Sequence, residues 1–225
     1  MFEKFAEINP FIWIVLGVFL IAGSVATILI VQKRRENKSG LVSRKQISVQ
    51  MLVHGALCIA IAFVLSYIRI YRFPQGGSIT PGSMLPIMLF AYIYGVGPGA
   101  ICSLGYGILQ MIQDSYFVHP AQILMDYILA FGVLCITGLF ANKKNMLPVG
   151  ILVAGLCRFA FHLVSGMIFF AAYAAEAGLS PFVYSFGYNI GYVLPDMGIC
   201  FVIALIPGVR NMMNRLRMQY RPVKA

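Results

Sequence analysis

The chain has 225 residues, of which 60% are hydrophobic and 11% charged, and its formal net charge is +10. Soluble domains are about 45–50% apolar and about 25% charged, so these few charged residues could not give a globule of this size a polar surface. The composition therefore excludes a soluble enzyme, a secreted module and a disordered chain.

Seven long apolar segments predict an all-α membrane protein rather than a β-barrel, whose strands alternate. The first, residues 11–31, has 21 residues without a charge and covers about 32 Å as a helix, enough for a bilayer core. Glu3 and Glu7 precede it, which is atypical of a signal peptide, so we expect a retained helix. The remaining segments are 47–71, 84–94, 99–112, 121–141, 147–175 and 182–206, with a Pro- and Gly-rich loop at 72–83.

The basic residues orient these spans. Seven crossings place the two ends of the chain on opposite sides, and one arrangement puts 13 of the 17 Lys and Arg residues on the same side. Basic residues gather on the cytoplasmic side of membrane proteins. We therefore expect a multi-pass plasma-membrane protein with its N-terminus outside and its C-terminus inside, and we attribute the net charge to topology rather than to nucleic-acid binding.

Other simple signatures are missing from the sequence. The five cysteines all lie in apolar segments without a CxxC pair, which predicts small buried side chains and neither a metal site nor a cofactor. No Walker A, HExxH or GxSxG pattern occurs. If this protein drives uphill transport with ATP, another chain has to hydrolyse it.

Three charged residues lie within apolar segments, where charges are rare and usually functional. Arg158 and Asp196 fall at similar depth on consecutive spans, which predicts a structural ion pair between them. Asp126 has no basic residue placed to neutralise it. It is therefore the leading candidate for a binding site.

Aromatic and polar residues recur in the same half of the predicted bundle as Asp126. His162, Gly166 and Phe170 share one helix face, and Tyr184 and Asn189 lie near the outer end of the last span. Singly, such residues are typical of interhelical hydrogen bonds or of the interfacial aromatic belt. Together with an unpaired carboxylate they indicate a site for an organic cation, held by charge pairing and cation–π attraction.

Small residues form a further pattern on the second span. Ala56 and Ala60 are four residues apart, a spacing that lets another helix approach closely. Packing within the bundle and docking onto another membrane subunit explain this pattern equally well.

Four sequence blocks carry a resemblance to a known family. They are Gly76-Gly-Ser-Ile-Thr with Met84-Leu-Pro-Ile, His119-Pro-Ala-Gln-Ile-Leu-Met-Asp-Tyr127, Arg158-Phe-Ala-Phe-His-Leu-Val-Ser-Gly166, and Ser180-Pro-Phe-Val-Tyr-Ser followed by Asn189. From residue 46 to about 208 the chain resembles the thiamine-specific substrate-binding (S) component of energy-coupling-factor transporters. The resemblance implies a six-helix membrane bundle without ATPase activity that works with a transmembrane coupling (T) subunit and two cytoplasmic ATPases.

The resemblance also implies site residues. The family's pocket positions fall on Tyr106, Tyr116, Asp126, Tyr127, His162, Gly166, Phe170, Tyr184 and Asn189. The family more often has Glu at position 126 and Trp at positions 106 and 170. Its docking surface falls on Ala56 and Ala60, and the loop 72–83 would act as a lid.

We therefore expect three regions: an extra transmembrane helix with a basic linker (1–45), a six-helix substrate-binding membrane domain (46–208) and a basic cytoplasmic tail (209–225). The predicted function is capture of thiamine for uptake, without catalysis. A thiamine precursor or another aromatic cationic vitamin is an alternative ligand. Alternatives of another class are an integral-membrane enzyme that uses Asp126 and His162 as an acid–base pair, and a packing subunit without a ligand.

Overall fold

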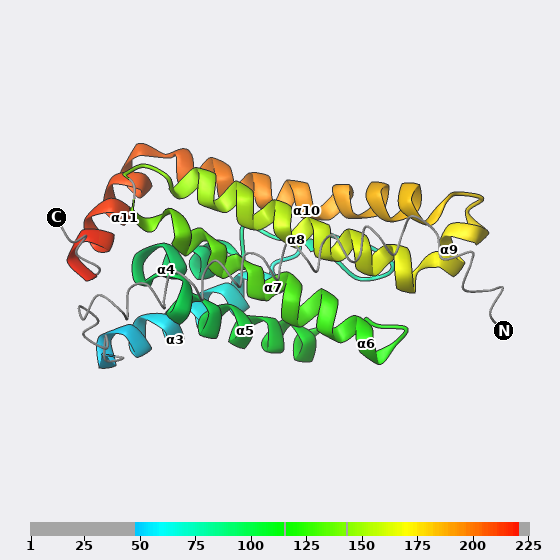
Figure 1. Ribbon diagram of the computed structural model, residues 1–225, viewed down its shortest axis with the longest axis horizontal. Helices are drawn as coiled ribbons and strands as arrows, with labels where there is room; N and C mark the ends of the chain where they lie inside the picture. Colours follow the sequence, from blue (N-terminus) through cyan, green and yellow to red (C-terminus); the bar gives the residue numbers. More distant parts are fainter. Residues whose placement is uncertain (1–47, 115, 143, 221–225) are drawn as a thin grey trace, which may run out of the picture. The chain divides into compact units, whose positions relative to one another are not determined.

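The computed structural model describes residues 48–114, 116–142 and 144–220, and this part of the chain is mostly helical (Figure 1). The predicted span at 11–31 lies outside the described residues. The elements are α3 (Val49–Tyr67), β1 (Tyr71–Arg72), β2 (Ser78–Ile79), α4 (Leu85–Tyr94), α5 (Val96–Gln113), α6 (Pro120–Ile123), the π-helix η1 (Leu124–Leu129), α7 (Ala130–Gly132), the 3₁₀-helix η2 (Val133–Asn142), α8 (Leu147–Phe169), α9 (Ala171–Glu176), α10 (Pro181–Leu205) and α11 (Pro207–Tyr220).

The described residues confirm the expected all-α membrane class. Four helical segments are long and apolar enough to cross a membrane: Val49–Tyr67, Pro120–Asn142, Leu147–Phe169 and Pro181–Leu205. The apolar helix α4 has only 10 residues. Helix α5 has 18 residues, but its glycines and glutamines make it less apolar than these four.

Two boundaries differ from the sequence expectation. The break between the third and fourth predicted spans is a single residue, Gly95, whose φ of 92° favours glycine. Helix α5 begins directly after it, because Pro98 falls in the first turn, where no amide donor is needed. The sixth predicted span, 147–175, is divided at Phe170 into α8 and α9.

The segment Pro120–Asn142 changes its winding along its length. It passes from α-helix to π-helix, back to one short α-helical stretch, and then to 3₁₀-helix. Long π- and 3₁₀-helical stretches are uncommon and often mark functional sites. This segment carries Asp126 on its π-helical part.

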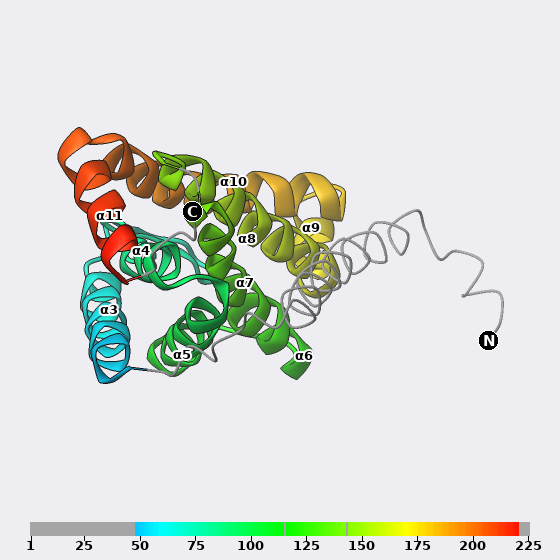
Figure 2. The same ribbon diagram turned by 60° about the vertical axis from the view of Figure 1, so that its left-hand side comes forward.

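Helix α4 lies in the hydrophobic core. Its Ile87, Met88 and Tyr92 are fully buried, and it contacts α3, α5, η2 and α11. Helices α8 and α10 lie side by side along their length, as both views show (Figures 1 and 2). We call the end of the bundle that carries α9 the α9 end and the opposite one the α11 end.

The C-terminal segment is more ordered than the expected basic tail. Its described part forms α11, which packs against α4 and α10. Asn214 bonds Asn145 through its Nδ2 at 2.7 Å, and Arg217 donates to the carbonyl of Ala141. Residues 207–220 therefore belong to the same compact unit as the bundle.

Candidate functional site

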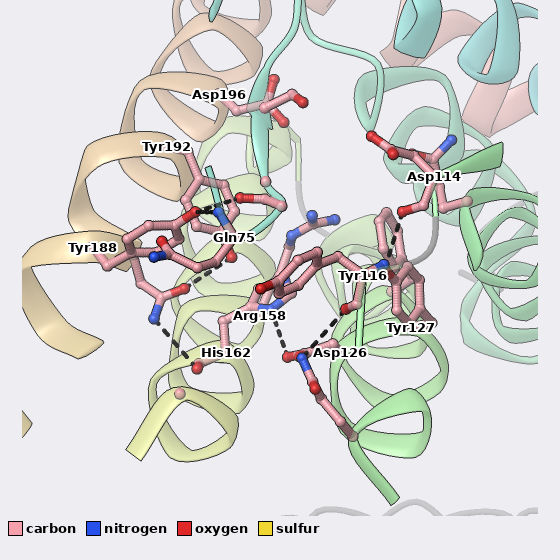
Figure 3. Close-up of a pocket in the computed structure, with 18 of the residues that line it drawn as sticks. Gln75, Asp114, Tyr116, Asp126, Tyr127, Arg158, His162, Tyr188, Tyr192 and Asp196 are labelled. Atoms are coloured by element: carbon pink, nitrogen blue, oxygen red, sulfur yellow. Dashed lines mark hydrogen bonds and ion pairs between the residues drawn. The ribbon is translucent and has the colours of Figure 1, made fainter. Parts of the chain in front are cut away.

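A pocket opens among the hairpin β1–β2, α5, the π-helix η1, α8 and α10 (Figure 3). It encloses about 1000 Å³ of space, which includes space open to solvent at its mouth. Its lining combines aromatic rings with charged groups. Every residue expected to contact a ligand lines it, except Tyr106.

Asp126 lies in this pocket with three hydrogen-bond donors around its carboxylate. Its Oδ1 is 2.9 Å from Nδ1 of His162, and its Oδ2 accepts from Ser165 Oγ and Gln122 Nε2, both at 2.8 Å. The expectation of an unpartnered carboxylate is therefore wrong. His162 was considered as its partner only in the enzyme alternative, and Gln122 and Ser165 were not considered because they are uncharged, although Gln122 lies one helical turn before Asp126.

Asp126 and Tyr127, consecutive residues of the π-helix η1, serve different walls of the pocket. Asp126 faces the pocket, while the hydroxyl of Tyr127 accepts from the Tyr116 amide at 3.0 Å and donates to the Asp114 carbonyl at 3.1 Å. A Cβ at Gly107 of α5 would collide with the Tyr127 carbonyl oxygen. Glycine at this position therefore leaves the room that the wide turn needs.

Aromatic rings form the α9-end wall of the pocket. Tyr116 stacks with Phe170 at a centroid distance of 6.1 Å, and its hydroxyl is 3.0 Å from that of Tyr173. That hydrogen bond, together with burial, raises the pKa of Tyr116 above its ordinary value, so its phenol stays protonated at neutral pH. Tyr184 stacks with Tyr188 at 6.3 Å. These electron-rich faces are suited to a cationic or heteroaromatic ligand.

Asn189 on α10 ties this wall to α8. Its Nδ2 donates to the carbonyl oxygens of Ser185 (2.8 Å) and His162 (3.3 Å), and its Oδ1 accepts from the Tyr192 hydroxyl at 2.8 Å. Gly166 on α8 permits the close approach, because a Cβ there would overlap the Ser185 side chain. Residues expected to contact a ligand therefore also pack these two helices together.

The hairpin covers one side of the pocket. Strands β1 and β2 pair antiparallel, Tyr71 with Ile79, and the turn between them contains Gly76 and Gly77 at positive φ. The Tyr188 hydroxyl accepts from the Gln75 amide at 3.0 Å and donates to the Gly76 carbonyl at 2.7 Å. The expected loop is therefore a short hairpin attached to α10.

The other end of the hairpin is held by charges. Asp114, at the end of α5, forms ion pairs with Arg72 at 2.7 Å and Arg69 at 3.0 Å. Arg69 and Asp114 also line the pocket. These ion pairs could not be recognised in the sequence, because the two arginines and Asp114 lie far apart along the chain.

The expected ion pair between Arg158 and Asp196 is not formed. Among the described residues, the ion pairs within 4.0 Å are Arg69–Asp114, Arg72–Asp114 and His162–Asp126. Arg158 lies over the ring of Phe131, 4.0 Å from its centroid, and Asp196 accepts from Thr80. Both charged side chains line the pocket instead.

Tyr106 is also placed differently from the expectation. It is fully buried in the core, packs edge-to-face against Phe131 at 5.3 Å, and points its hydroxyl at the Ala62 carbonyl. Phe131 lines the pocket and Tyr106 does not, so the tyrosine supports the wall from behind.

The two alanines expected to form a docking surface, Ala56 and Ala60, are both exposed on α3 and do not line the pocket.

Several further residues line the pocket. Tyr188 and Tyr192 lie on α10 at a spacing of four residues from Tyr184, a spacing that already places the three tyrosines on one helix face in the sequence. The hairpin residues carry no comparable signal. The lining that sequence reasoning missed includes Gln75, Gly76, Gly77, Thr80, Gln122 and Ser185.

Comparison with known proteins places this chain in a family. The family described as thiamine transporter protein (Thia_YuaJ) matches residues 52–214. The thiamine transporter ThiT of Bacillus subtilis (strain 168) is 33% identical, over 68% of this chain and 86% of that relative. A solved structure of ThiT from Listeria monocytogenes superposes with a TM-score of 0.64 at 23% identity, over 74% of this chain and 97% of that one, which supports the fold. The family match and the B. subtilis relative together show that the chain belongs to the thiamine transporter family.

Proposed function

We propose that this protein captures thiamine in the pocket around Asp126 as the substrate-binding subunit of an uptake transporter. The observation that carries the proposal is a half-buried carboxylate beside a histidine, 2.9 Å apart, in a cavity walled by aromatic rings. The membership of the chain in the thiamine transporter family supports the ligand class.

The chemistry of the pocket suits this ligand. Thiamine joins a thiazolium cation to an aminopyrimidine ring. The Asp126 carboxylate supplies the negative charge that a desolvated cation needs, and the faces of Phe170, Tyr116 and Tyr184 supply cation–π and stacking contacts. Both carboxylate oxygens of Asp126 are held by hydrogen bonds from neighbouring side chains, so the negative charge is oriented before a ligand binds.

The transport role requires partners. The family resemblance implies a transmembrane coupling subunit and two cytoplasmic ATPases. We infer that Ala56 and Ala60 contact the coupling subunit, because both small residues are exposed on α3 and small exposed residues let a second helix approach closely. The distribution of Lys and Arg supports an orientation with the α9 end of the pocket facing outward.

Calorimetric titration of thiamine into the detergent-purified protein tests the proposal. We expect binding at micromolar or tighter affinity, and a loss of about tenfold or more in Asp126→Asn, because the amide removes the charge while keeping the shape. Glu176→Gln is the matched control, since Glu176 is exposed and does not line the pocket. Equal affinity in the Asp126 variant would exclude the proposed site.

Two alternatives are tested alongside. A precursor or another aromatic cationic vitamin that binds more tightly than thiamine would change the ligand but not the role. The Asp126–His162 pair also has the geometry of an acid–base pair. Detectable turnover of thiamine by the purified protein, lost in His162→Ala, would favour an enzyme.

A further inference from the structure

Helix α11 leaves the direction of α10 at a sharp bend. Ile206, which follows α10, has non-helical backbone angles (φ −58°, ψ 121°), and Pro207 begins α11. In both views α11 crosses the end of the bundle instead of continuing along it (Figures 1 and 2). Leu205 and Ile206 are exposed just before the bend, as expected of side chains that still face the acyl layer of a membrane. If α10 crosses the membrane, α11 therefore begins at the membrane surface.

The α11 end of the bundle carries positive charge. Arg210, Arg215 and Arg217 lie on α11, and Lys144 lies in the turn before α8. The acidic residues of the described part, Asp114, Asp126, Glu176 and Asp196, follow α5 or lie on η1, α9 and α10. Ion pairs within 4.0 Å among the described residues are made only by Asp114 and Asp126. The positive charge at the α11 end is therefore not compensated by an ion pair within the described part of the chain.

Arg217 is a fixed part of this charge. It is 5% exposed, and its Nη1 donates to the carbonyl of Ala141 at the end of η2. Its buried Nε has no hydrogen-bond partner in the described part of the chain. A group on the surface cannot reach this buried atom, but the charge adds to the field that attracts anions to the surface.

One side-chain hydrogen bond holds two exposed cations close together. Asn214 on α11 donates through its Nδ2 to Asn145 Oδ1 at 2.7 Å. Lys144 and Arg215 each adjoin one member of this pair, and both are exposed. The bond therefore joins the turn and the helix into one surface that presents both charges.

The outward face of α11 combines this charge with apolar side chains. Met212 and Met218 are 51% and 63% exposed, and Arg215 lies midway between them, three residues from each. Residues three apart on a helix share a face. At a membrane interface the methionines can enter the acyl boundary while the arginine extends to the phosphate groups. This face therefore suits a lipid interface better than water.

We propose that α11 lies in the cytoplasmic interface of the membrane and binds anionic phospholipids through Arg215 and Lys144. Met212 and Met218 lie at the acyl boundary beside them. An anionic headgroup compensates the positive surface, whereas a zwitterionic headgroup brings a cation of its own and gains less. The inference uses the expected cytoplasmic position of the C-terminus. It goes beyond the proposed function, because it does not depend on the ligand in the pocket.

A single tryptophan on α11 reports which lipids this helix contacts. Trp13→Phe removes the only native tryptophan, and Met218→Trp places a reporter on the exposed face. The full chain is reconstituted in vesicles of phosphatidylcholine and phosphatidylglycerol, with quenching bromine atoms on the acyl chains of one lipid or the other. We expect both to quench the reporter. The relative association constant should favour phosphatidylglycerol about fivefold or more, because each basic residue at an anionic surface contributes about that factor.

Two charge variants assign this preference to the proposed surface. In Lys144→Gln with Arg215→Gln, two exposed side chains lose their charge, and the preference for phosphatidylglycerol should fall toward one. The matched control, Arg34→Gln with Arg35→Gln, removes the same charge from the basic linker. It should leave the preference at the α11 reporter unchanged.

A second reporter position controls for general contact with lipid. Leu156→Trp replaces Met218→Trp in the same background, on α8 at a position that is 54% exposed. About nine residues separate it from the start of α8, so it lies well inside the acyl layer. Both brominated lipids should quench this tryptophan equally.

The remaining outcomes would overturn the proposal. A reporter at position 218 that neither lipid quenches, while position 156 is quenched, would show that α11 faces water or a protein partner. Equal association of both lipids at position 218 would exclude selective binding of anionic headgroups. A preference that survives in the Lys144 and Arg215 variant, or that the linker variant loses equally, would place its cause elsewhere. Thiamine titration of the same proteins keeps the two proposals distinct, because absence of thiamine binding would overturn the proposed function without changing the lipid result.

Discussion

At the scale of single residues, Asp126 is held ready for a ligand by uncharged or weakly basic groups. Ser165 and Gln122 donate to one of its oxygens and His162 contacts the other. These bonds stabilise the half-buried carboxylate without the full positive charge that would compete with a cationic ligand. The same donors fix its direction, which lowers the entropy lost when a ligand binds.

Gly166 gives a prediction about the opposite wall. Gly166→Ala would place a methyl group 3.0 Å from Ser185 Cβ and 3.4 Å from Asn189 Nδ2, so α10 has to shift and Asn189 with it. We expect thiamine affinity to fall about tenfold, with a free energy of unfolding lower by about 1–3 kcal/mol. Calorimetric titration and thermal unfolding in detergent measure the two effects.

The matched control for this prediction is Gly187→Ala. Gly187 lies on α10 and nothing is within 4 Å of the position its Cβ would take. The substitution should leave affinity unchanged and keep or raise stability, because alanine favours helix more than glycine does. An equal loss of affinity in both variants would contradict the role given to Gly166.

The sequence identifies residues well where a strong rule applies. A charge within an apolar span is rare, so Asp126, Arg158 and Asp196 stand out without a structure, and all three line the pocket. Their partners follow weaker rules. Matched depth suggested that Arg158 and Asp196 pair, but depth does not determine the direction of a side chain, and Thr80 of the hairpin bonds Asp196 instead.

At the scale of elements, the π-helix η1 depends on α5. Gly107→Ala would push the Tyr127 carbonyl and the Phe131 side chain, whose Cβ is 3.1 Å from the added atom. We expect the wide turn to be lost and Asp126 to turn away, with a fall of about tenfold in thiamine affinity measured by calorimetry. In the double variant with Gly107→Ala and Asp126→Asn, the loss of binding free energy should be smaller than the sum of the losses in the two single variants, because both substitutions remove the same interaction.

Gly105→Ala on the same helix is the control. Its added methyl would touch only Ile59, at 3.4 Å, an ordinary contact. It should therefore bind thiamine like the wild-type protein. Additive losses in the Gly107 and Asp126 double variant would show that Gly107 acts on stability rather than on the carboxylate.

The hairpin gives a kinetic prediction. Tyr188→Phe keeps the ring but removes the two hydrogen bonds to Gln75 and Gly76. If the hairpin covers the bound ligand, its opening becomes easier, and the dissociation rate of thiamine should rise about tenfold while the association rate changes little. Stopped-flow displacement measures both rates. Tyr67→Phe is the control, because Tyr67 is 61% exposed.

Element boundaries can be predicted from the sequence only where a residue type, such as proline, fixes the backbone locally. Pro120 and Pro181 begin helices, as proline in a first turn does. The π-helical and 3₁₀-helical parts of residues 124–142 have no comparable signature in the sequence, because their winding depends on contacts with neighbouring residues such as Gly107. The hairpin was expected as a Pro- and Gly-rich loop, and its strands could not be predicted because two residues each are too few to show an alternating pattern.

At the scale of the whole molecule, the pocket and the proposed coupling surface lie on different parts of the described bundle. Most pocket residues lie on α5, η1, α8, α10 and the hairpin, and α3 contributes Ser66 near its C-terminal end. Ala56 and Ala60 lie exposed on the same helix, six or more residues before Ser66. This arrangement predicts that coupling can be removed without loss of binding.

Ala56→Trp combined with Ala60→Trp tests that separation. Two large rings on an exposed face do not disturb the core, but they prevent close approach of a second helix. We expect unchanged thiamine affinity in the purified protein, loss of copurification with the coupling subunit and the ATPases, and loss of uptake in cells. The control variant is Val202→Trp, at a position of α10 that is 62% exposed. It should retain thiamine affinity, copurification and uptake. Uptake that persists in the double variant would place the coupling surface elsewhere, and affinity lost together with uptake would show that α3 supports the pocket itself.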